Sequence, residues 1–323
     1  MTLQEMISQL NLSEATLTAL ATAEGDTFNG AANQFISAIV NKICYQVVET
    51  TKFVNPFAKY KKFDIEYGDT VENVFVEIPS GYDYDKDATD PFTKATPSVQ
   101  TLYLTINFER QYEVTIQADL IRRAVLSKVG FDKLVNTIIT SLGKAADLED
   151  YAATLKMLNN TDIMAGGAIQ ELDVSALATD EDKAKAICTS MVDTSSSFQQ
   201  PVETNNNLGV LNPTLETNIL LVVKRSVLNK INLDFLAGIY NLSKVDLIKN
   251  IIEVESFQYG DNDSEIDYMV LDEDGFDIHQ ALRDNGQIYN PKGRYFNHFS
   301  DNWKAFGFKR WANCKAFKIK WTA

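Results

Sequence analysis

The chain has 323 residues, of which 45 % are hydrophobic, so it can bury a sizeable core and disorder is not favoured. Its 30 basic and 44 acidic residues give a net charge of −14. That charge argues against tight, sequence-independent DNA binding, which requires Lys and Arg to neutralise phosphates. Residues 1–20 have no basic start typical of a signal peptide, and no apolar run reaches the roughly 18–20 residues that span a bilayer.

The N-terminal part of the chain predicts one helix. Apolar residues recur at helical spacing over residues 26–48, and Asp26 or Thr27 can cap the start of this helix. Pro56 ends the helical pattern. A basic cluster then follows, formed by three lysines: Lys59, Lys61 and Lys62.

The next region predicts an extended arm. Residues 81–97 are polar and rich in Asp and Tyr, with few apolar side chains to bury. Residues 101–116 then alternate between apolar and polar with a period of two, which predicts one strand on the order of 50 Å long. Because a typical strand has only about 5–6 residues, we expect this strand to project beyond its own domain. Residues 55–117 are therefore predicted to form a long β-hairpin arm.

The middle of the chain changes from one long helix to short elements. Residues 131–159 keep helical spacing and predict a helix about 44 Å long. After Gly166 and Gly167, short helical and apolar segments alternate, which indicates a small α/β lobe. Its predicted elements are helices at 180–190 (capped by Thr179), at 233–240 and from 243 onward, a loop at 195–207, and strands at 219–223 and 268–271.

The C-terminal part is aromatic and basic. Residues 290–293, Asn-Pro-Lys-Gly, predict a turn. Residues 317–321 alternate apolar with Lys and predict a strand. Charge and rings together could bind nucleic acid through Lys309, Arg310, Trp311, Lys315 and Phe317. A half-buried edge strand with its lysines directed outward is the preferred interpretation.

The sequence contains few signs of catalysis. No nucleophile elbow, phosphate-binding loop or dinucleotide-binding fingerprint is present. The two histidines, His279 and His298, are interpreted as ordinary surface or interface residues. Three distant cysteines form neither a metal spacing nor a disulfide framework: Cys44, Cys188 and Cys314. We therefore expect a protein that is not an enzyme and has no cofactor.

One acidic string has partial calcium-loop spacing. Loop positions 1, 3, 5 and 12 would be taken by Asp261, Asp263, Glu265 and Asp272. The sixth position is Ile266, where the sharp turn of such a loop needs Gly. The following residues also predict a strand, not the helix that a calcium hand requires. A solvated acidic turn is therefore preferred, and no metal site is predicted.

The order of parts resembles the Hong-Kong-97-type capsid fold of tailed phages, and local segments resemble the major capsid proteins of the phi-29-like group. That order is N-terminal helix, β-arm, long helix, α/β lobe and returning strand. The similar segments include Asn55-Pro-Phe-Ala-Lys-Tyr-Lys-Lys62, Leu233-Asp-Phe-Leu-Ala237, Asn290-Pro-Lys-Gly-Arg-Tyr-Phe-Asn297 and Arg310-Trp-Ala-Asn313. The best-known relative carries a further immunoglobulin-like domain after this point, and we expect this chain to lack it.

The resemblance implies an α+β fold with five parts. They are an N-arm at 1–54, an extended β-hairpin (E-loop) at 55–117, a spine helix with the first part of the P-domain at 118–170, an A-domain at 171–277, and returning P-domain strands at 278–323. It implies a major capsid protein that assembles through hexamers and pentamers into an icosahedral or prolate shell around double-stranded DNA. Expected further partners are a scaffold protein, a portal and, weakly, the packaged DNA, with no membrane. The virion shell would be assembled in the host cytoplasm.

Contacts between subunits are expected at charged and aromatic residues. In this hypothesis the lysine cluster meets the acidic arm of a neighbour. The candidates are Lys59, Lys61, Lys62, Asp83, Asp85, Asp87, Arg110, Trp303 and Trp311. Two alternatives remain: an encapsulin-like cage subunit, which shares this fold, and an uncharacterised α/β hydrolase.

Overall fold

The structure is a computed structural model that describes residues 52–79, 81, 83, 86, 96–117, 131–231, 250–258, 265–293 and 295–322. The predicted helices at 26–48 and 233–240, the helix expected from 243, and most of the arm tip lie outside these residues. The described chain divides into two compact units. One contains residues within 113–144 and 286–299, and the other contains residues within 53–112, 145–285 and 300–322.

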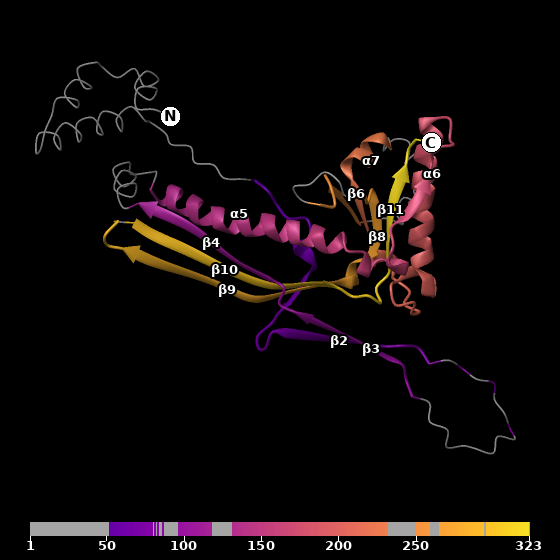
Figure 1. Cartoon of the computed structure of the whole chain (residues 1–323), viewed down its shortest axis with the longest axis horizontal. Coiled ribbons are helices and arrows are strands. Elements are labelled where there is room, and N and C mark those ends of the chain that lie inside the picture. Colours follow the sequence, from indigo (N-terminus) through magenta and orange to yellow (C-terminus); the bar gives the residue numbers. More distant parts are fainter. Residues whose placement is uncertain are drawn as a thin grey trace, which may run out of the picture. The chain divides into compact units, whose positions relative to one another are not determined.

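A five-stranded sheet forms the core of the larger unit (Figure 1). Its spatial order is β5-β11-β8-β6-β7, with bounds Gln170–Asp173, Cys314–Lys320, Tyr268–Asp272, Ile219–Lys224 and Asn250–Val254. Strands β8 and β6 are almost wholly apolar and buried, as expected for strands that are covered on both faces. The predicted strands at 219–223 and 268–271 are confirmed. Strand β11 is an inner strand that pairs with β5 and β8, so its interpretation as an edge strand was wrong.

Two apolar clusters cover this sheet. One face packs on α6, Asp180–Phe198, through residues such as Ile187 and Phe198. The other cluster contains Leu155 and Leu158 at the end of α5. Helix α6 starts as predicted, because the Thr179 hydroxyl accepts from the amide of Asp182. It continues to residue 198, so the loop predicted from 195 begins later than expected.

Helix α5 spans Phe131–Leu158, which confirms the long helix predicted at 131–159. The shorter helices of the described residues are α7, Arg225–Lys230, and six 3-10 turns: η1 Ala58–Tyr60, η2 Thr161–Ile163, η3 Ala165–Gly167, η4 Glu203–Asn205, η5 Glu216–Asn218 and η6 Glu273–Gly275. Among the helices that the structure describes, none is long and apolar enough to cross a membrane.

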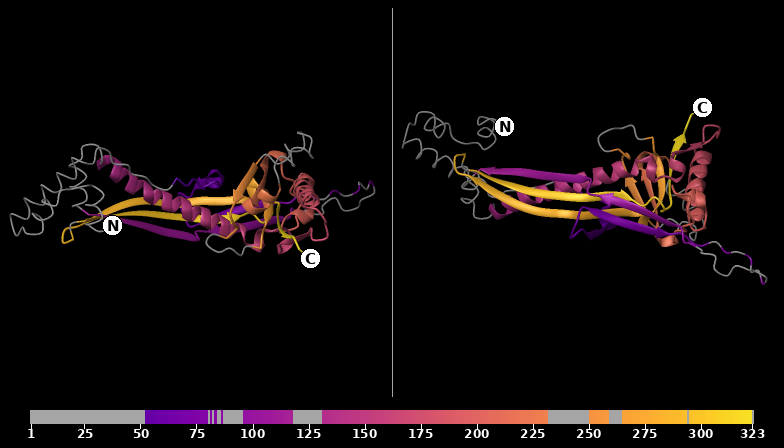
Figure 2. Two further views of the ribbon diagram at one scale, coloured as in Figure 1. Left: turned by 90° about the horizontal axis from the view of Figure 1, so that it is seen from above. Right: turned by 60° about the horizontal axis from the view of Figure 1, so that its bottom comes forward.

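A second sheet contains the longest strands (Figure 2). Its order is β1-β9-β10-β4, with bounds Lys61–Asp64, Phe276–Asn290, Tyr295–Phe308 and Phe108–Gln117. The predicted turn at 290–293 connects β9 to β10. The carboxamide oxygen of Asn290 accepts from the amides of Lys292 and Gly293 at 3.0 and 3.1 Å, the local bonding by which Asn stabilises turns.

A separate antiparallel hairpin is formed by β2, Thr70–Val76, and β3, Val99–Thr105. The single strand predicted over 101–116 is therefore wrong, since the chain changes sheets between β3 and β4. Asn107 lies at this break. Its side-chain amide donates to the carbonyl of Phe306 at 2.8 Å, and its side-chain oxygen accepts from the Phe306 amide at 2.9 Å. The side chain thus pairs with the β10 backbone at the point where β3 ends and β4 begins.

Candidate functional site

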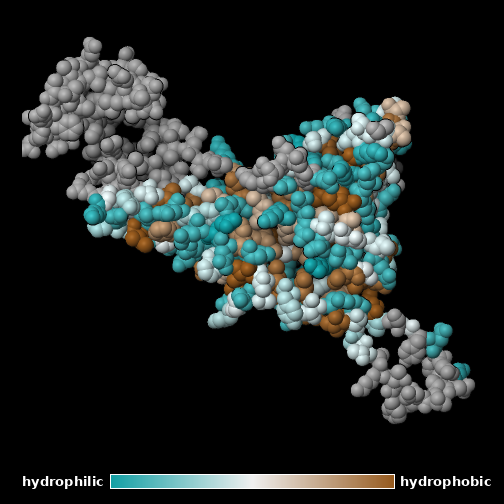
Figure 3. All heavy atoms as spheres, in the orientation of Figure 1, coloured by the Kyte–Doolittle hydropathy of each residue, from teal (hydrophilic) through white to brown (hydrophobic). Residues whose placement is uncertain are grey.

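The outer face of the β2–β3 hairpin is exposed and combines large apolar side chains with Thr and Glu. Side chains alternate along both strands between half-buried and exposed positions. The outward row contains Val74, Val76, Ile78, Val99 and Tyr103, which are 48–66 % exposed. Apolar residues are visible among polar ones in the space-filling view (Figure 3). A row of large apolar side chains on one surface is typical of a binding face.

The inner face of the hairpin packs on the larger unit. The ring of Phe75 stacks on Trp311 with centroids 5.5 Å apart. Leu104 approaches Gly307 on β10 so closely that a methyl group there would lie 2.8 Å from a Leu104 methyl. These contacts fix the base of the hairpin and leave its outer face free of other described parts of the chain.

A buried polar joint also holds the hairpin. The side-chain amide of Asn73 donates to Asp277 Oδ2 at 2.6 Å, and Asp277 Oδ1 lies 2.9 Å from His279 Nε2. His279 is 1 % exposed, so its interpretation as a surface or interface residue was wrong. Its ring lies against Phe63 of β1 at 4.2 Å. His298, by contrast, is half-buried.

The lysine cluster lies at the start of β1. Lys61 pairs with Asp64 at 2.8 Å, and Lys62 lies 3.7 Å from Asp274. Lys59 lies over the ring of Tyr60 at 4.8 Å, and none of its described neighbours is an acidic ion-pair partner. Two of the three lysines are therefore already paired within the chain, although all three remain exposed. Such exposed pairs contribute little to stability.

The other candidate contact residues are placed differently. Asp83 is exposed, and Asp85 and Asp87 lie outside the described residues. Arg110 pairs with Glu149 on α5 at 3.1 Å. Trp303 is 39 % exposed, whereas Trp311 is 7 % exposed and packs on Phe75. Their contact with a neighbouring subunit stays a prediction, and Trp303 offers more surface for it than Trp311.

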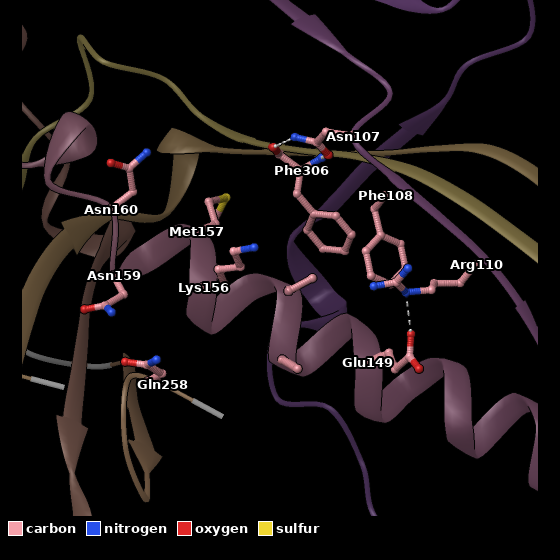
Figure 4. A pocket seen from close by; sticks show the side chains of 12 residues that line it. Asn107, Phe108, Arg110, Glu149, Lys156, Met157, Asn159, Asn160, Gln258 and Phe306 are labelled. Carbon is pink, nitrogen blue, oxygen red and sulfur yellow. Dashed lines mark hydrogen bonds and ion pairs between the residues drawn. The ribbon is translucent and has the colours of Figure 1, made fainter. Parts of the chain in front are cut away.

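A groove of about 800 Å³ lies between α5, the start of β4 and β10 (Figure 4). Its floor is apolar and includes Phe108, Met157 and Phe306, and the two phenylalanine rings meet edge to face at 5.3 Å. The Arg110–Glu149 pair, Lys156 and four side-chain amides provide the polar part of its lining. The amides belong to Asn107, Asn159, Asn160 and Gln258. A small apolar floor with a polar rim suits a protein segment or a small ligand.

The C-terminal Asn313 motif has a structural role that the sequence did not reveal. The Asn313 side-chain amide donates to the carbonyl of Asn212 at 2.7 Å and to the Thr214 hydroxyl at 3.0 Å. The Thr214 hydroxyl donates in turn to Asp272 at 2.9 Å. Asn313 is 1 % exposed, so these bonds satisfy buried polar groups and hold the loop after α6 against β11. The Asn-rich composition of that loop was the available signal.

The calcium-loop spacing has no structural support. Asp272 lies in strand β8, 6 % exposed, and accepts hydrogen bonds from Thr214 and from the amide of Asp274. Burial raises the pKa of its carboxyl. Among the described residues no group of three or more His, Cys, Asp or Glu could hold a metal ion, and Asp261 and Asp263 lie outside them.

The aromatic residues considered for nucleic-acid stacking are buried. Phe317 stacks on Tyr268 with centroids 4.7 Å apart. Lys315 donates to the side-chain oxygen of Asn205 at 2.7 Å, and burial lowers its pKa. The lysines of β11 that do point outward, Lys318 and Lys320, pair with acidic residues. The geometry thus disfavours a base-stacking surface on β11.

Comparisons with known proteins agree with one family. The profile of the Phi29-like phage major capsid proteins matches residues 2–318. The major capsid protein of Streptococcus phage Cp-1 is 30 % identical over 251 residues, which cover 74 % of this chain and 68 % of the relative. The major capsid protein of Bacillus phage PZA is 24 % identical over 289 residues, covering 88 % of this chain and 63 % of the relative. The chain thus spans a little under two thirds of the PZA protein.

Solved structures share the fold. The capsid structure of Staphylococcus phage Andhra aligns with a TM-score of 0.64 at 10 % identity, covering 86 % of this chain and 87 % of that one. The mature capsid of bacteriophage PhiM1 gives 0.57 at 12 % identity, covering 85 % and 90 %. The α+β Hong-Kong-97-type capsid fold predicted from the sequence is confirmed. The chain belongs to the family of Phi29-like phage major capsid proteins.

Proposed function

We propose that this chain is the shell subunit of a tailed phage head and assembles with copies of itself around double-stranded DNA. The observation that carries the proposal is the hairpin β2–β3, whose inner face packs on its own chain while Val74, Val76 and Tyr103 on the outer face stay exposed. A two-stranded hairpin is marginally stable alone. The exposed apolar side chains of the outer face therefore gain most when a neighbouring subunit covers them.

We propose that each part of the capsid fold corresponds to one range of this chain. Residues 1–54 form the N-arm, and 55–117 contain the E-loop, whose paired part is β2–β3. Helix α5 is the spine helix within 118–170, the A-domain spans 171–277, and 278–323 return to the P-domain. Because β4 pairs with β10, residues 108–117 act with the P-domain sheet. The subunit works as a structural protein and not as an enzyme.

Neighbouring copies are the proposed main partners, in hexamers and pentamers. The further proposed partners are a scaffold protein, a portal and, through weak contacts, the packaged DNA. Assembly is proposed to take place in the host cytoplasm. Among the cluster lysines, Lys59 is the best candidate to meet the acidic arm tip of a neighbour, since Lys61 and Lys62 already have partners. Reversing the charge of Lys59 should impair assembly, and reversing Asp83 as well should partly restore it. Normal assembly of the Lys59→Glu variant would show that Lys59 does not lie at a subunit interface.

The decisive experiment replaces the outer face of the hairpin. The double variant Val74→Ser with Val76→Ser should keep the wild-type circular dichroism spectrum and melting temperature, because both residues are more than half exposed. Its particle yield, counted by electron microscopy, should fall about tenfold, since burying the exposed half of each valine contributes on the order of 0.8 kcal/mol at every subunit contact.

The matched control is Leu215→Ser, which removes an apolar side chain that is 71 % exposed elsewhere in the same unit. This variant should assemble normally. A deletion of residues 81–97 extends the test to the arm tip and should likewise stop assembly while the secondary structure is retained. Wild-type particle yield from both the double variant and the deletion would contradict the proposal.

A further inference from the structure

A buried cluster of Lys, Asn and Asp lies where β10 contacts α5, inside the larger unit. Asn302 and Lys304 stand two residues apart on β10 and are 4 % and 8 % exposed. Alternate residues of a strand point to the same face, and here both side chains meet Asp150 of α5. The Lys304 ammonium pairs with Asp150 Oδ2, and the Asn302 side-chain amide donates to Asp150 Oδ1 at 3.5 Å. One carboxylate thus contacts both nitrogen atoms.

A fourth buried side chain holds the carbonyl of Asn302. The side-chain amide of Gln280 on β9 donates to Asn302 Oδ1 at 2.7 Å. The same amide donates to the backbone carbonyls of Leu282 and Trp303 at 2.7 and 3.0 Å, so its orientation is fixed. A fixed donor at a carbonyl oxygen stabilises the negative charge that develops there when a nucleophile attacks the carbon.

These contacts supply every part that an amide exchange needs. The nucleophile is the Lys304 amine, which is carried on a flexible four-carbon stem. Positions 302 and 304 are only about 6.6 Å apart along an extended strand, so this stem is long enough to bring Nζ to Cγ of Asn302. Asp150 can take a proton from the attacking nitrogen and give one to the leaving nitrogen, because it contacts both. Burial keeps competing water away from the carbon.

We propose that Lys304 and Asn302 become joined within the folded chain by an amide bond between Nζ and Cγ, with Asp150 as the proton carrier. Asp150 accepts a proton from the Lys304 ammonium, and the neutral amine attacks Asn302 Cγ while Gln280 donates to the oxygen. Asp150 then moves a proton from Nζ to Nδ2, and the bond from Cγ to Nδ2 breaks. Ammonia leaves, Asp150 stays protonated, and no oxidant or reductant takes part.

The products suit the buried site better than the reactants. Before the reaction the site holds a buried ion pair, Lys304 with Asp150, and taking two charges out of water is costly. Burial raises the pKa of the Asp150 carboxyl, and the Lys304 charge opposes that shift. Once the amide has formed, the opposing charge is gone and the carboxyl can stay neutral. The reaction therefore replaces two buried charges by neutral groups and fixes β10 at its contact with α5.

The same unit contains a Lys–Asn contact without an acid, which serves as an internal control. Lys315 Nζ donates to Asn205 Oδ1 at 2.7 Å, and Asn205 is fully buried. Burial is the cause of the lowered pKa of Lys315, and among the described residues no acidic side chain forms an ion pair with it. This pair has a nucleophile and an amide but no carboxylate to carry the proton, so it should stay unlinked.

Mass spectrometry of the full-length chain, folded first and then denatured, tests the bond. The wild type should be lighter than its sequence requires by the mass of one ammonia molecule. Trypsin should not cut after Lys304, because its amine is blocked, and the uncut peptide of residues 295–309 should carry the missing mass. Trypsin should cut normally after Lys315, the control lysine.

Three variants assign the parts. Lys304→Arg keeps a positive charge beside Asp150 but removes the amine, and should have the full mass. Asp150→Asn keeps both reacting side chains and removes the proton carrier, so it should also have the full mass and be cut after Lys304. The matched control Lys315→Arg should keep the mass deficit of the wild type.

The decisive result comes from the wild type and does not depend on how the variants fold. Full mass together with normal cleavage after Lys304 would overturn the proposal. A missing ammonia with normal cleavage there would place the loss at another residue and would overturn it as well. A link that persists in Asp150→Asn would refute the role of Asp150. None of these measurements requires particles, so failure here is distinct from failure of the proposed shell function.

Discussion

The hairpin β2–β3 and the five-stranded sheet use similar β-forming residues with opposite results. In β6, Ile219 to Val223 are at most 3 % exposed because helices and neighbouring strands cover both faces. In the hairpin, Val74 and Val76 are 55 % and 57 % exposed on one face, while the other face packs on the same chain. The sheet completes its burial within one chain, and the hairpin does not.

This difference separates two kinds of stability. Residues of the sheet should determine whether the chain folds, because their apolar surface is removed from water in the single chain. Residues on the outer hairpin face should determine whether chains associate, because their surface is buried only when another molecule covers them. Substitutions in the two regions should therefore affect different measurements.

The largest expected loss of folding stability comes from the sheet. Leu220→Ala removes a fully buried side chain of the apolar cluster that contains Leu155 and Leu158, and should lower the free energy of unfolding by about 2–5 kcal/mol. Denaturant unfolding followed by circular dichroism measures this loss. The control is Ile251→Ala on the adjacent strand β7, 47 % exposed, which should change stability by no more than about 0.5 kcal/mol. Similar losses in both variants would contradict the comparison.

The inner face of the hairpin should give an intermediate effect. Phe75→Ala removes the ring that stacks on Trp311 at 5.5 Å. Because Phe75 is only half-buried, the loss should be about 1–2 kcal/mol, roughly half of that for a fully buried ring. Thermal unfolding measures it against Val76→Ala, the outward neighbour, which should unfold like the wild type. A loss as large as that of Leu220→Ala would mean that the hairpin belongs to the folding core.

Periodicity predicted much of the fold because burial on one face leaves a regular pattern. The long helix, the α6 start at Thr179, the buried strand at 219 and the turn at 290 all followed from spacing and turn chemistry. The alternation over 101–116 failed at Asn107. A strand that passes from one sheet to another keeps its period of two, so the pattern alone does not reveal the change.

The site could be predicted only in part. The polar joint at His279 joins residues about 200 positions apart along the chain, Asn73 and Asp277, and no local pattern marks such a pair. The lysine cluster was recognised as charge, but the pairing of Lys62 with Asp274 depends on the fold. Resemblance supplied the capsid family, whereas the partners of single side chains required the three-dimensional structure.

The buried carboxyl of Asp272 in the sheet should make a small contribution to the pH dependence of stability. Burial raises the pKa of this carboxyl, with hydrogen bonds from Asp274 and Thr214 opposing the shift. The folded chain thus holds this proton more tightly than the unfolded chain. Its contribution is therefore favourable at low pH and falls as the pH rises from about 3.9, the ordinary value of Asp, through the raised pKa.

Asp272→Asn removes this titration. The melting temperature of the variant relative to wild type should be higher at pH 7.5 than at pH 4. Scanning calorimetry at both values measures the difference. Glu265→Gln, an exposed acid of the same unit, serves as the control and should show no such trend. An equal difference at both pH values for Asp272→Asn would contradict the role assigned to burial.

The smallest expected effect is a null result that tests whether burial alone holds the subunits together. Boiled particles on a denaturing gel should run as one band near 36.2 kDa. A covalent link between subunits could form between a Lys and an Asn that lie beside an acid. Lys304, Asn302 and Asp150 are such a set, but these side chains meet inside one chain and cannot link two chains. The proposed hairpin contact would then rely on apolar burial, at about 25 cal/mol per Å². A ladder that survives boiling and reductant would contradict this prediction.

The accessibility of the cysteines tests whether disulfides link the subunits. Cys188 and Cys314 are at most 1 % exposed. Burial raises the pKa of Cys188 to about 11 and also raises that of Cys314, so both thiols should resist maleimide in native particles. Cys44 lies outside the described residues. A ladder that collapses with reductant would therefore be assigned to Cys44, and Cys44→Ser should abolish it. If the ladder persisted in that variant, a buried cysteine must become exposed during assembly, and the sheet would not be the self-contained region that its burial indicates.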